Sequence, residues 1–166
     1  MNIHLTPVKT SLLGHLLIAG IGSRIVRIRL DGDDEQLRAD LERQFPDGAF
    51  KRGSPTTQDA ARAIKHYLNG GETPDLDVLL PQVGFATRVW QQLRRIPRGQ
   101  VRTYGRIARS IRRPAAARAV GQACGRNPLP LVYPCHRVVT ADRSLGGFSA
   151  GPAKKRKLLE LEGVSL

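Results

Sequence analysis

The hydrophobic pattern changes near the middle of the chain, and this change constrains the fold more than any other feature. In the first half, segments with strand periodicity alternate with segments of helical periodicity. In the second half, the periodic segments are helical and short. Because Pro81 and Gly84 lie between the two parts, we predict two small domains that span residues 1–80 and 84–166.

The first domain is expected to be an α/β scaffold in which an antiparallel sheet carries helices. An apolar run at 15–19 and an alternating stretch at 26–30 predict two strands that are joined by a turn. Helical spacing predicts one helix that includes residues 37–45 and a second at 55–68. Residues 76–80 fit either a further strand or an extended linker. No constellation of catalytic residues is found in this part of the sequence.

The second domain is expected to be mostly helical and carries the pattern of a helix-turn-helix. Helices are predicted at 87–96, after a capping Thr103 and at 115–124, with Pro114 in the first turn of the last one. Arg118 is the only long side chain in the first half of that helix, and its small residues would let the backbone approach DNA. The alternative is an alanine-rich packing helix that exposes one arginine.

The positive charge is concentrated in the second half of the chain. Residues 1–83 contain 10 Lys and Arg against 11 Asp and Glu, which gives a net charge of −1. Residues 84–166 contain 17 Lys and Arg against 3 Asp and Glu, which gives +14. Such asymmetry indicates a polyanionic partner, most often nucleic acid. A basic surface that serves only solubility is the alternative, but solubility does not require one-sided charge.

The two cysteines, Cys124 and Cys135, cannot build a disulfide framework, and no Cys/His spacing indicates a zinc site. Free thiols fit a reducing compartment, so we expect a cytoplasmic protein. The interrupted apolar run at 12–21 is better explained by a strand and a turn than by a signal peptide. No segment approaches the length of a membrane helix.

Cys135 stands directly before His136 in the stretch VYPCHRVV. A neighbouring base raises the thiolate fraction of a cysteine, and such a base usually needs an orienting partner. The predicted C-terminal helix at 152–162 places Glu162 on the same face as Leu158, where a carboxylate needs a partner. Cys135, His136 and Glu162 would form a Cys–His–Glu relay. A water molecule or a bent backbone would connect Cys135 to His136. A structural cysteine and a capping glutamate are the alternative.

The residues named above resemble the O6-alkylguanine-DNA alkyltransferases, also called methylated-DNA–protein-cysteine methyltransferases. The stretch PCHRV at 134–138 matches the family's acceptor motif, which is highly specific. The matching recognition helix, hinge, lesion-pocket loop and terminal helix lie at 117–121, 126–128, 147–149 and 161–163. The resemblance runs in register from about residue 85 to residue 163 and is looser in the first half.

The resemblance implies a role for each matched residue near the thiol. Cys135 would accept the alkyl group, His136 would act as a base linked to it by water, and Glu162 would orient that base. Asn127 resembles the hinge asparagine that braces the active-site turn. Tyr104 resembles the tyrosine whose hydroxyl reaches the flipped guanine and helps to protonate the leaving base.

The resemblance also implies which residues contact the DNA and the lesion. Arg118 resembles the finger that fills the gap left in the duplex. The further DNA-binding candidates are Thr103, Tyr104, Ala117, Ala119 and Gly121. The candidates for the guanine pocket are Tyr104, Phe148, Val138 and Ser149, the last two largely through backbone groups. Many relatives carry a phenol where Phe148 stands here, so the apolar wall is kept but a hydroxyl is lost.

The function implied by the resemblance is single-use DNA repair. O6-alkylguanine, and O4-alkylthymine as well, would be flipped out of double-stranded DNA, and the alkyl group would pass irreversibly to Cys135. We expect a monomer that needs no cofactor, no metal and no membrane. The rival functions are a non-catalytic helix-turn-helix lesion sensor or regulator, which would lack the acceptor cysteine, and a Cys–His hydrolase, which would not explain the basic charge.

Overall fold

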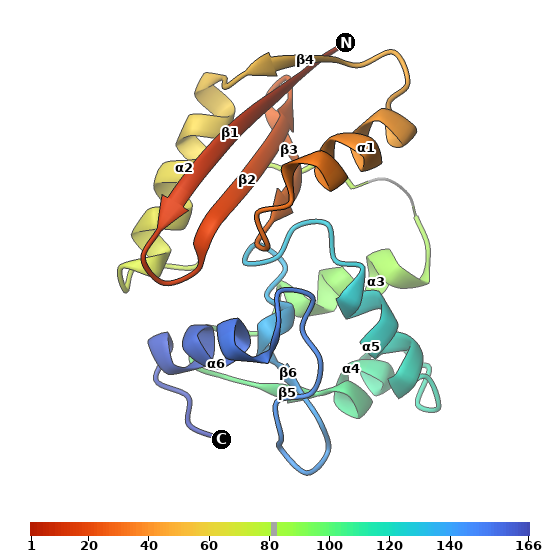
Figure 1. Ribbon diagram of the computed structural model, residues 1–166. Helices are drawn as coiled ribbons and strands as arrows, with labels where there is room; N and C mark the ends of the chain where they lie inside the picture. The colour runs from red at the N-terminus through yellow and green to blue at the C-terminus, as the bar shows by residue number, and fades with distance from the viewer. Residues whose placement is uncertain (81–82) are drawn as a thin grey trace. The chain divides into compact units, whose positions relative to one another are not determined.

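The computed structural model describes residues 1–80 and 83–166. The chain forms two compact units, Met1–Leu79 and Leu80–Leu166 (Figure 1). The first combines a sheet with helices and the second is mostly helical, which confirms the predicted fold class. Pro81, predicted to mark the boundary, lies outside the described residues, and Gly84 is the residue that precedes the first helix of the second unit.

The sheet of the first unit has the strand order β3-β2-β1-β4. Its strands are β1 (Asn2–Thr10), β2 (Gly14–Ile21), β3 (Arg24–Arg29) and β4 (Ala49–Arg52). The two predicted strands, β2 and β3, pair antiparallel, as do β1 and β2, whereas β4 pairs in parallel with β1. The parallel pair arises because a helix connects β3 to β4 and returns the chain along the sheet.

Two of these strands, β1 and β4, carry weak signals in the sequence and were not predicted. Pro7 interrupts the alternation of Ile3, Leu5 and Val8 in β1, and β4 is short and mostly exposed. β4 pairs with β1 only as far as Leu5. Pro7 therefore lies where β1 is open on one side, which is where strands tolerate proline.

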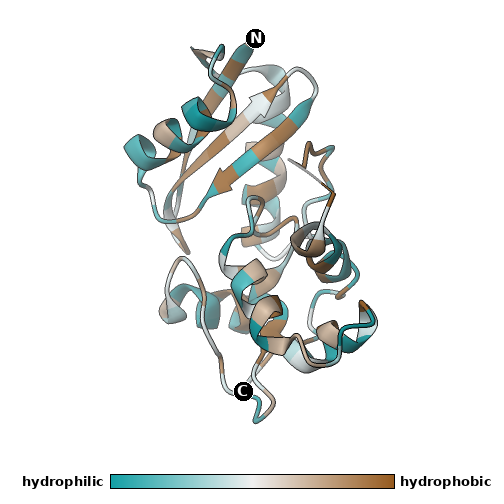
Figure 2. Ribbon diagram, turned by 90° about the vertical axis from the view of Figure 1, so that its right-hand side faces the viewer, coloured by the Kyte–Doolittle hydropathy of each residue, from teal (hydrophilic) through white to brown (hydrophobic). Residues whose placement is uncertain are grey.

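Helices cover both faces of the sheet. They are α1 (Asp34–Gln44) and α2 (Pro55–Leu68). The buried run at 16–20 in β2 requires this double cover. Leu37 and Leu41 of α1 belong to the core cluster on one face. On the other, a Cβ atom at Gly20 would lie 2.8 Å from Cγ2 of Thr57 in α2, so glycine lets this helix approach closely. Figure 2 shows the strands as largely hydrophobic.

Residues 71–80 form an extended linker, one of the two predicted alternatives for 76–80, and not a full strand. A single parallel bridge joins Val78 to Ile25 of β3. Ile25 donates its N–H to the Asp77 carbonyl at 2.9 Å and accepts from the Leu79 N–H at 2.9 Å. The linker is thus held against the edge of the sheet.

The second unit packs short helices around the segment that contains Cys135. Its elements are α3 (Phe85–Leu93), β5 (Arg102–Thr103), α4 (Tyr104–Ser110), α5 (Ala117–Gly125), the 3-10 turn η1 (Cys135–Arg137), β6 (Val138–Val139) and α6 (Pro152–Leu161). Trp90 of α3 donates its indole N–H to the Ala123 carbonyl of α5 at 2.9 Å. Among the described residues, no helix has the length and apolar character to span a membrane.

The helix-turn-helix consists of α4 and α5, and the second helix starts later than predicted. Residues 114–116 form a turn, in which the Ala116 N–H donates to the Arg113 carbonyl at 2.9 Å. Pro114 is therefore outside the helix, because Ala116 rather than Arg113 takes the N-cap position. At the end of the chain, Glu162 is the C-cap of α6 rather than its last helical residue.

The N-terminus of α2 generates a prediction about stability. The Ser54 hydroxyl accepts from the Thr57 N–H at 3.2 Å, and the Thr57 hydroxyl accepts from the Ser54 N–H at 2.9 Å, which is a reciprocal capping box. Ser54→Ala should lower the free energy of unfolding by about 1 kcal/mol in urea denaturation. Ser23→Ala, in an exposed turn, is the control and should change it by less than about 0.5 kcal/mol. Equal effects would contradict the capping role.

Candidate active site

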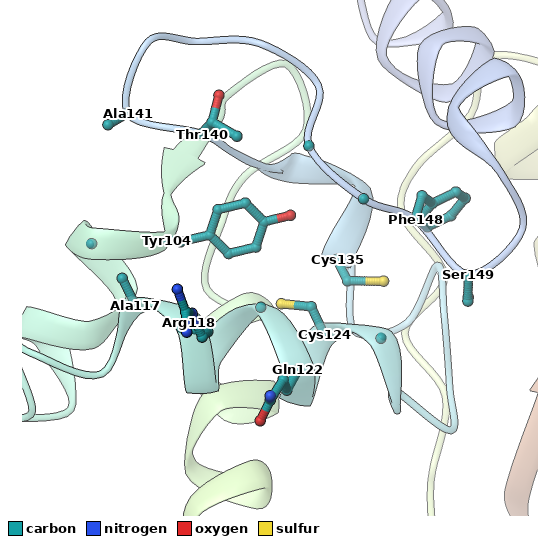
Figure 3. A pocket seen from close by; sticks show the side chains of 15 residues that line it. Tyr104, Ala117, Arg118, Gln122, Cys124, Cys135, Thr140, Ala141, Phe148 and Ser149 are labelled. Carbon is teal, nitrogen blue, oxygen red and sulfur yellow. The ribbon is translucent and has the colours of Figure 1, made fainter.

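A largely apolar pocket opens in the second unit between the helix-turn-helix, η1 and the loop that follows β6 (Figure 3). The residues that line it are Tyr104, Gly105, Ala117, Arg118, Gly121, Gln122, Cys124, Gly125, Cys135, Thr140, Ala141, Gly146, Gly147, Phe148 and Ser149. Segments that are far apart in the sequence thus share one pocket. The chemistry of this pocket depends on its two thiols and on the charged groups buried behind them.

Cys135 is the first residue of η1 and is only 4% exposed. Burial raises the pKa of its thiol. A hydrogen bond from the Asn127 side chain, the positive charge of Lys155 and backbone N–H groups act in the opposite direction. Thiolate formation at Cys135 is therefore opposed by the apolar surroundings and favoured by specific polar neighbours.

Asn127 braces the segment that leads from α5 to Cys135. Its Nδ2 donates to the Tyr133 carbonyl at 2.6 Å, and its Oδ1 accepts from the Leu129 N–H at 3.0 Å. The amide therefore braces the loop between α5 and the turn that contains Cys135. Both ends of the side chain are in use, so the amide has a fixed orientation.

Glu162 binds two neighbours of the thiol at the same time. Its Oε1 lies 2.9 Å from Nε2 of His136. Arg137 donates from Nε to both carboxylate oxygens at 3.1 and 3.0 Å and from Nη2 to Oε1 at 2.7 Å. All three side chains are at most 2% exposed. The structure thus brings His136 and Glu162 together, and it adds an arginine that the sequence analysis did not single out.

This arrangement fixes the protonation state and the tautomer of His136. Burial lowers the pKa of the imidazole, and the bond to Glu162 only partly opposes this effect. A carboxylate can only accept a hydrogen bond, so Nε2 of the neutral ring carries the proton. Nδ1 then holds the lone pair, which is the form of histidine that can take up a proton.

Tyr104 is the first residue of α4, and its phenol projects into the pocket (Figure 3). Burial and the two neighbouring thiols raise the pKa of its hydroxyl to about 12, so the phenol is protonated at neutral pH. Gly146 has a φ of +69°, and a Cβ atom there would lie 2.9 Å from the Tyr104 hydroxyl oxygen. A glycine at this position lets the pocket loop lie against the ring.

The other residues predicted to contact DNA occupy different positions around this pocket. Arg118, Ala117 and Gly121 of α5 line it, and Arg118 is exposed. Ala119 does not line the pocket. Thr103 caps α4 by accepting from the Arg106 N–H at 3.1 Å, so its hydroxyl serves the helix.

Three of the four residues predicted for the guanine pocket, Tyr104, Phe148 and Ser149, line it, and Val138 is not among the lining residues. Phe148 is half-buried and Ser149 is exposed at the pocket. Val138 is fully buried in β6, where it pairs with Arg102 of β5. Its carbonyl accepts a hydrogen bond from Lys155 at 2.6 Å.

The sequence analysis assigned no functional role to three residues near the Cys135 thiol, which are Arg137, Lys155 and Cys124. Lys155 could have been found from its spacing, because it precedes Leu158 and Glu162 at helical intervals on the buried side of α6. Arg137 lies inside the acceptor motif, but its partner is remote in sequence. Among the described residues, no group of three or more His, Cys, Asp or Glu could hold a metal ion.

Comparisons with known proteins point to one family. The family model for the DNA binding domain of 6-O-methylguanine DNA methyltransferase matches residues 84–164. A methylated-DNA–protein-cysteine methyltransferase from Methanosarcina acetivorans is 39% identical over 149 residues, which cover 85% of this chain and 94% of that protein. The bifunctional transcriptional activator/DNA repair enzyme Ada from Escherichia coli is 36% identical over 151 residues, but the chain spans only 43% of its length.

Solved structures agree with the sequence comparisons. The Mycobacterium tuberculosis O6-methylguanine methyltransferase has a TM-score of 0.82 and 35% identity, and the match covers 96% of this chain and 92% of that one. The M. tuberculosis OGT in complex with DNA has a TM-score of 0.81 and 33% identity, with 98% and 92% coverage. The likeness therefore extends over both units.

The buried ion pair generates a prediction that is independent of activity. Arg137→Met leaves the Glu162 carboxylate buried without its strongest partner and should lower the free energy of unfolding by about 3–5 kcal/mol. Arg109→Met, on the exposed side of α4, is the matched control and should change it by less than about 0.5 kcal/mol. Urea denaturation measures both. A small effect of Arg137→Met would mean that the pair does not hold this region together.

Proposed function

The chain belongs to the 6-O-methylguanine DNA methyltransferase family, and on this premise we propose that it repairs DNA by transferring an alkyl group from O6 of guanine to its own Cys135. The observation that carries the proposal is the shared pocket: the Cys135 thiol and the helix-turn-helix line the same cavity. A base that is turned out of a duplex bound at the helix-turn-helix would enter beside the thiol.

Cys135 rather than Cys124 is the acceptor, although both line the pocket. Burial raises the pKa of both thiols, that of Cys124 to about 12, and the positive charge of Lys155 acts in the opposite direction on each. Cys135 in addition receives a hydrogen bond from the Asn127 side chain. Hydrogen bonds to sulfur favour the thiolate, which is the nucleophilic form.

The transfer is a displacement in which the thiol proton leaves first. His136, neutral and with its lone pair on Nδ1, takes this proton through a bridging water, and Glu162 holds the ring in place. The sulfur electron pair then forms a bond to the alkyl carbon, and the bond from that carbon to O6 breaks. The electrons of that bond stay with the guanine, and the protein keeps a thioether.

Tyr104 assists the departure of the base. Its phenol is protonated at neutral pH because burial raises the pKa to about 12. A hydroxyl that projects into the pocket can donate a hydrogen bond or a proton to the guanine as negative charge develops on it. Stabilisation of the leaving base is needed because the alkyl carbon is otherwise unreactive toward a thiolate in water.

DNA is held mainly by charge, and the lesion is reached by flipping. The net charge of +14 in residues 84–166 favours phosphate contacts that are independent of sequence. Arg118, exposed on α5 at the edge of the pocket, fills the space that the flipped nucleotide leaves in the duplex. Such a plug offsets part of the unstacking cost, which is a few kcal/mol.

Each molecule repairs one lesion, because the thioether contains no good leaving group. O6-alkylguanine is the main substrate, and O4-alkylthymine presents a comparable alkyl group. The protein acts as a monomer in the cytoplasm, where a reducing environment keeps the free thiols of Cys124 and Cys135 available.

Stoichiometric methylation of Cys135 is the first test of this function. Incubation with duplex DNA that carries O6-methylguanine should add one methyl group to the peptide that contains Cys135, as measured by mass spectrometry. Cys135→Ser should gain none and still bind the duplex. Multiple turnovers, or a methyl group on Cys124, would contradict the mechanism. Lesion binding by the wild-type protein without any gain in mass would instead favour a lesion sensor.

A second test separates flipping from chemistry. Arg118→Ala should lower the single-turnover rate on duplex DNA by about tenfold or more, because the flipped state loses more than about 1.4 kcal/mol. The rate with free O6-benzylguanine, which needs no flipping, should change by less than about threefold. Arg109→Ala, which removes an exposed charge outside the pocket lining, is the control for lost phosphate attraction. Equal slowing of both reactions by Arg118→Ala would rule out the finger role.

A further inference from the structure

The exposed face of α5, the second helix of the helix-turn-helix, carries an uncharged polar side chain that the proposed mechanism leaves unused. The exposed residues of this helix are Arg118, Gln122 and Gly125, and its C-cap, Arg126, is exposed as well. Arg118, Gln122 and Arg126 follow one another at intervals of four residues, so they form a row along one side of the helix. The row places the Gln122 amide between two guanidinium groups.

Gln122 lies at the edge of the pocket rather than beside the reacting groups. It lines the same pocket as Cys135 and Tyr104, yet its amide points away from both of them in Figure 3. The preceding residue, Gly121, is the one that faces the phenol, because a Cβ atom there would lie 3.7 Å from Cε1 of Tyr104. The amide is therefore turned from the chemistry and toward the outside of the helix.

The Gln122 amide is available to a partner outside the chain. In the part of the chain that the structure describes, this side chain makes no hydrogen bond to another residue. A primary amide donates two hydrogen bonds and accepts two, so it is satisfied only by water or by a bound molecule. On a helix that would dock on a duplex, the bound molecule is DNA.

The chemistry of an amide matches base edges. Phosphate oxygens only accept hydrogen bonds, and cations bind them most strongly. Arg118 and Arg126 already supply two cations to this side of α5. Base edges in the grooves offer both donors and acceptors, which a glutamine can pair with. The uncharged member of the row is therefore the one suited to read sequence.

The spacing along α5 places Gln122 near the site of flipping. Four residues of an α-helix rise by about 6 Å. Successive bases of one strand are about 3.4 Å apart along the duplex. A helix that lies in a groove and inserts Arg118 into the vacated position therefore brings Gln122 to within one or two base pairs of the gap.

We propose that Gln122 is a specificity-determining residue, whose amide forms a hydrogen bond with the base pair beside the flipped nucleotide and makes repair depend on the flanking sequence. The inference rests on the proposed function, because it takes Arg118 as the residue that fills the gap. It adds one contact that reads sequence to the phosphate contacts, which do not. The roles of Cys135, His136 and Tyr104 stay as described above.

Duplexes that carry the same O6-methylguanine in different flanking sequences test this inference. The single-turnover rate is measured with each of the four base pairs on either side of the lesion. For the wild-type protein, the fastest and slowest flanks should differ by about tenfold, which corresponds to one base contact. Gln122→Ala should slow the favoured duplexes and reduce the difference to less than about threefold. Gln91→Ala, exposed on α3, is the matched control and should keep the wild-type pattern.

Several results would overturn the inference. Equal slowing of all duplexes by Gln122→Ala would mean that the amide contacts a phosphate or a sugar. A pattern of rates that is the same in Gln122→Ala and in the wild type would mean that the flanks act through the deformability of the DNA, or have no effect. Alanine favours helix, so α5 should remain intact, and the rate with free O6-benzylguanine should not change. A slower reaction with the free base would place Gln122 inside the pocket and reject its role in reading DNA.

A binding experiment separates this inference from the proposed function. If no methyl group reaches Cys135 on any duplex, the proposed function is rejected, and the same comparison is made by affinity. Cys135→Ser is titrated with each duplex, with and without Gln122→Ala. An affinity that varies with the flank in the single variant and no longer varies in the double variant would support the role of Gln122. An equal variation in both would show that Gln122 does not read the flanking base pair.

Discussion

The buried carboxylate of Glu162 is the contact on which the active site depends. It lies at the end of α6, yet it binds His136 and Arg137 of η1 and accepts from the Gly99 N–H at 3.4 Å. Arg137 in turn donates to the Ile96 carbonyl at 2.6 Å. One neutralised anion thus ties the last helix, the nucleophile's turn and the segment after α3 together. Without Arg137, the buried charge of Glu162 would destabilise the region by about 3–5 kcal/mol, so the two residues depend on each other.

The helix-turn-helix, α4 and α5, also forms one wall of the pocket that contains Cys135. Thr103 ends β5 and caps α4, which fixes the direction in which the next residue, Tyr104, leaves the backbone. β5 pairs with β6, and β6 directly follows the nucleophile's turn. The paired strands β5 and β6 therefore hold the Tyr104 phenol and the Cys135 thiol in place relative to each other. In the proposed reaction, docking of a duplex and placement of the leaving base would therefore both depend on these two strands.

The sequence predicted those features that depend on local pattern, and it missed those that depend on remote partners. The acceptor motif, the helix pair and the apolar face of α6 were readable because each lies within one segment. Pro7 obscured the strand pattern of β1. The strand tolerates this proline because its pairing with β4 ends at Leu5. Lys155 lies in the basic stretch 154–157 and was not singled out from the sequence, whereas the folded chain buries it and joins it to the pocket loop at Gly147. Val138 was expected at the pocket largely through its backbone, and the structure buries its side chain where β6 pairs with β5.

The enclosure of Cys135 has a consequence for its lifetime in the cell. Its residue is 4% exposed, and the sulfur is reached through the pocket rather than from the open surface. In thiol–disulfide exchange, the thiolate attacks one sulfur of a disulfide and must line up with both of its sulfurs. A disulfide can therefore meet this sulfur only from the side of the pocket. The enclosure that a flipped base would have to enter thus also limits the directions from which an oxidised thiol compound can approach Cys135.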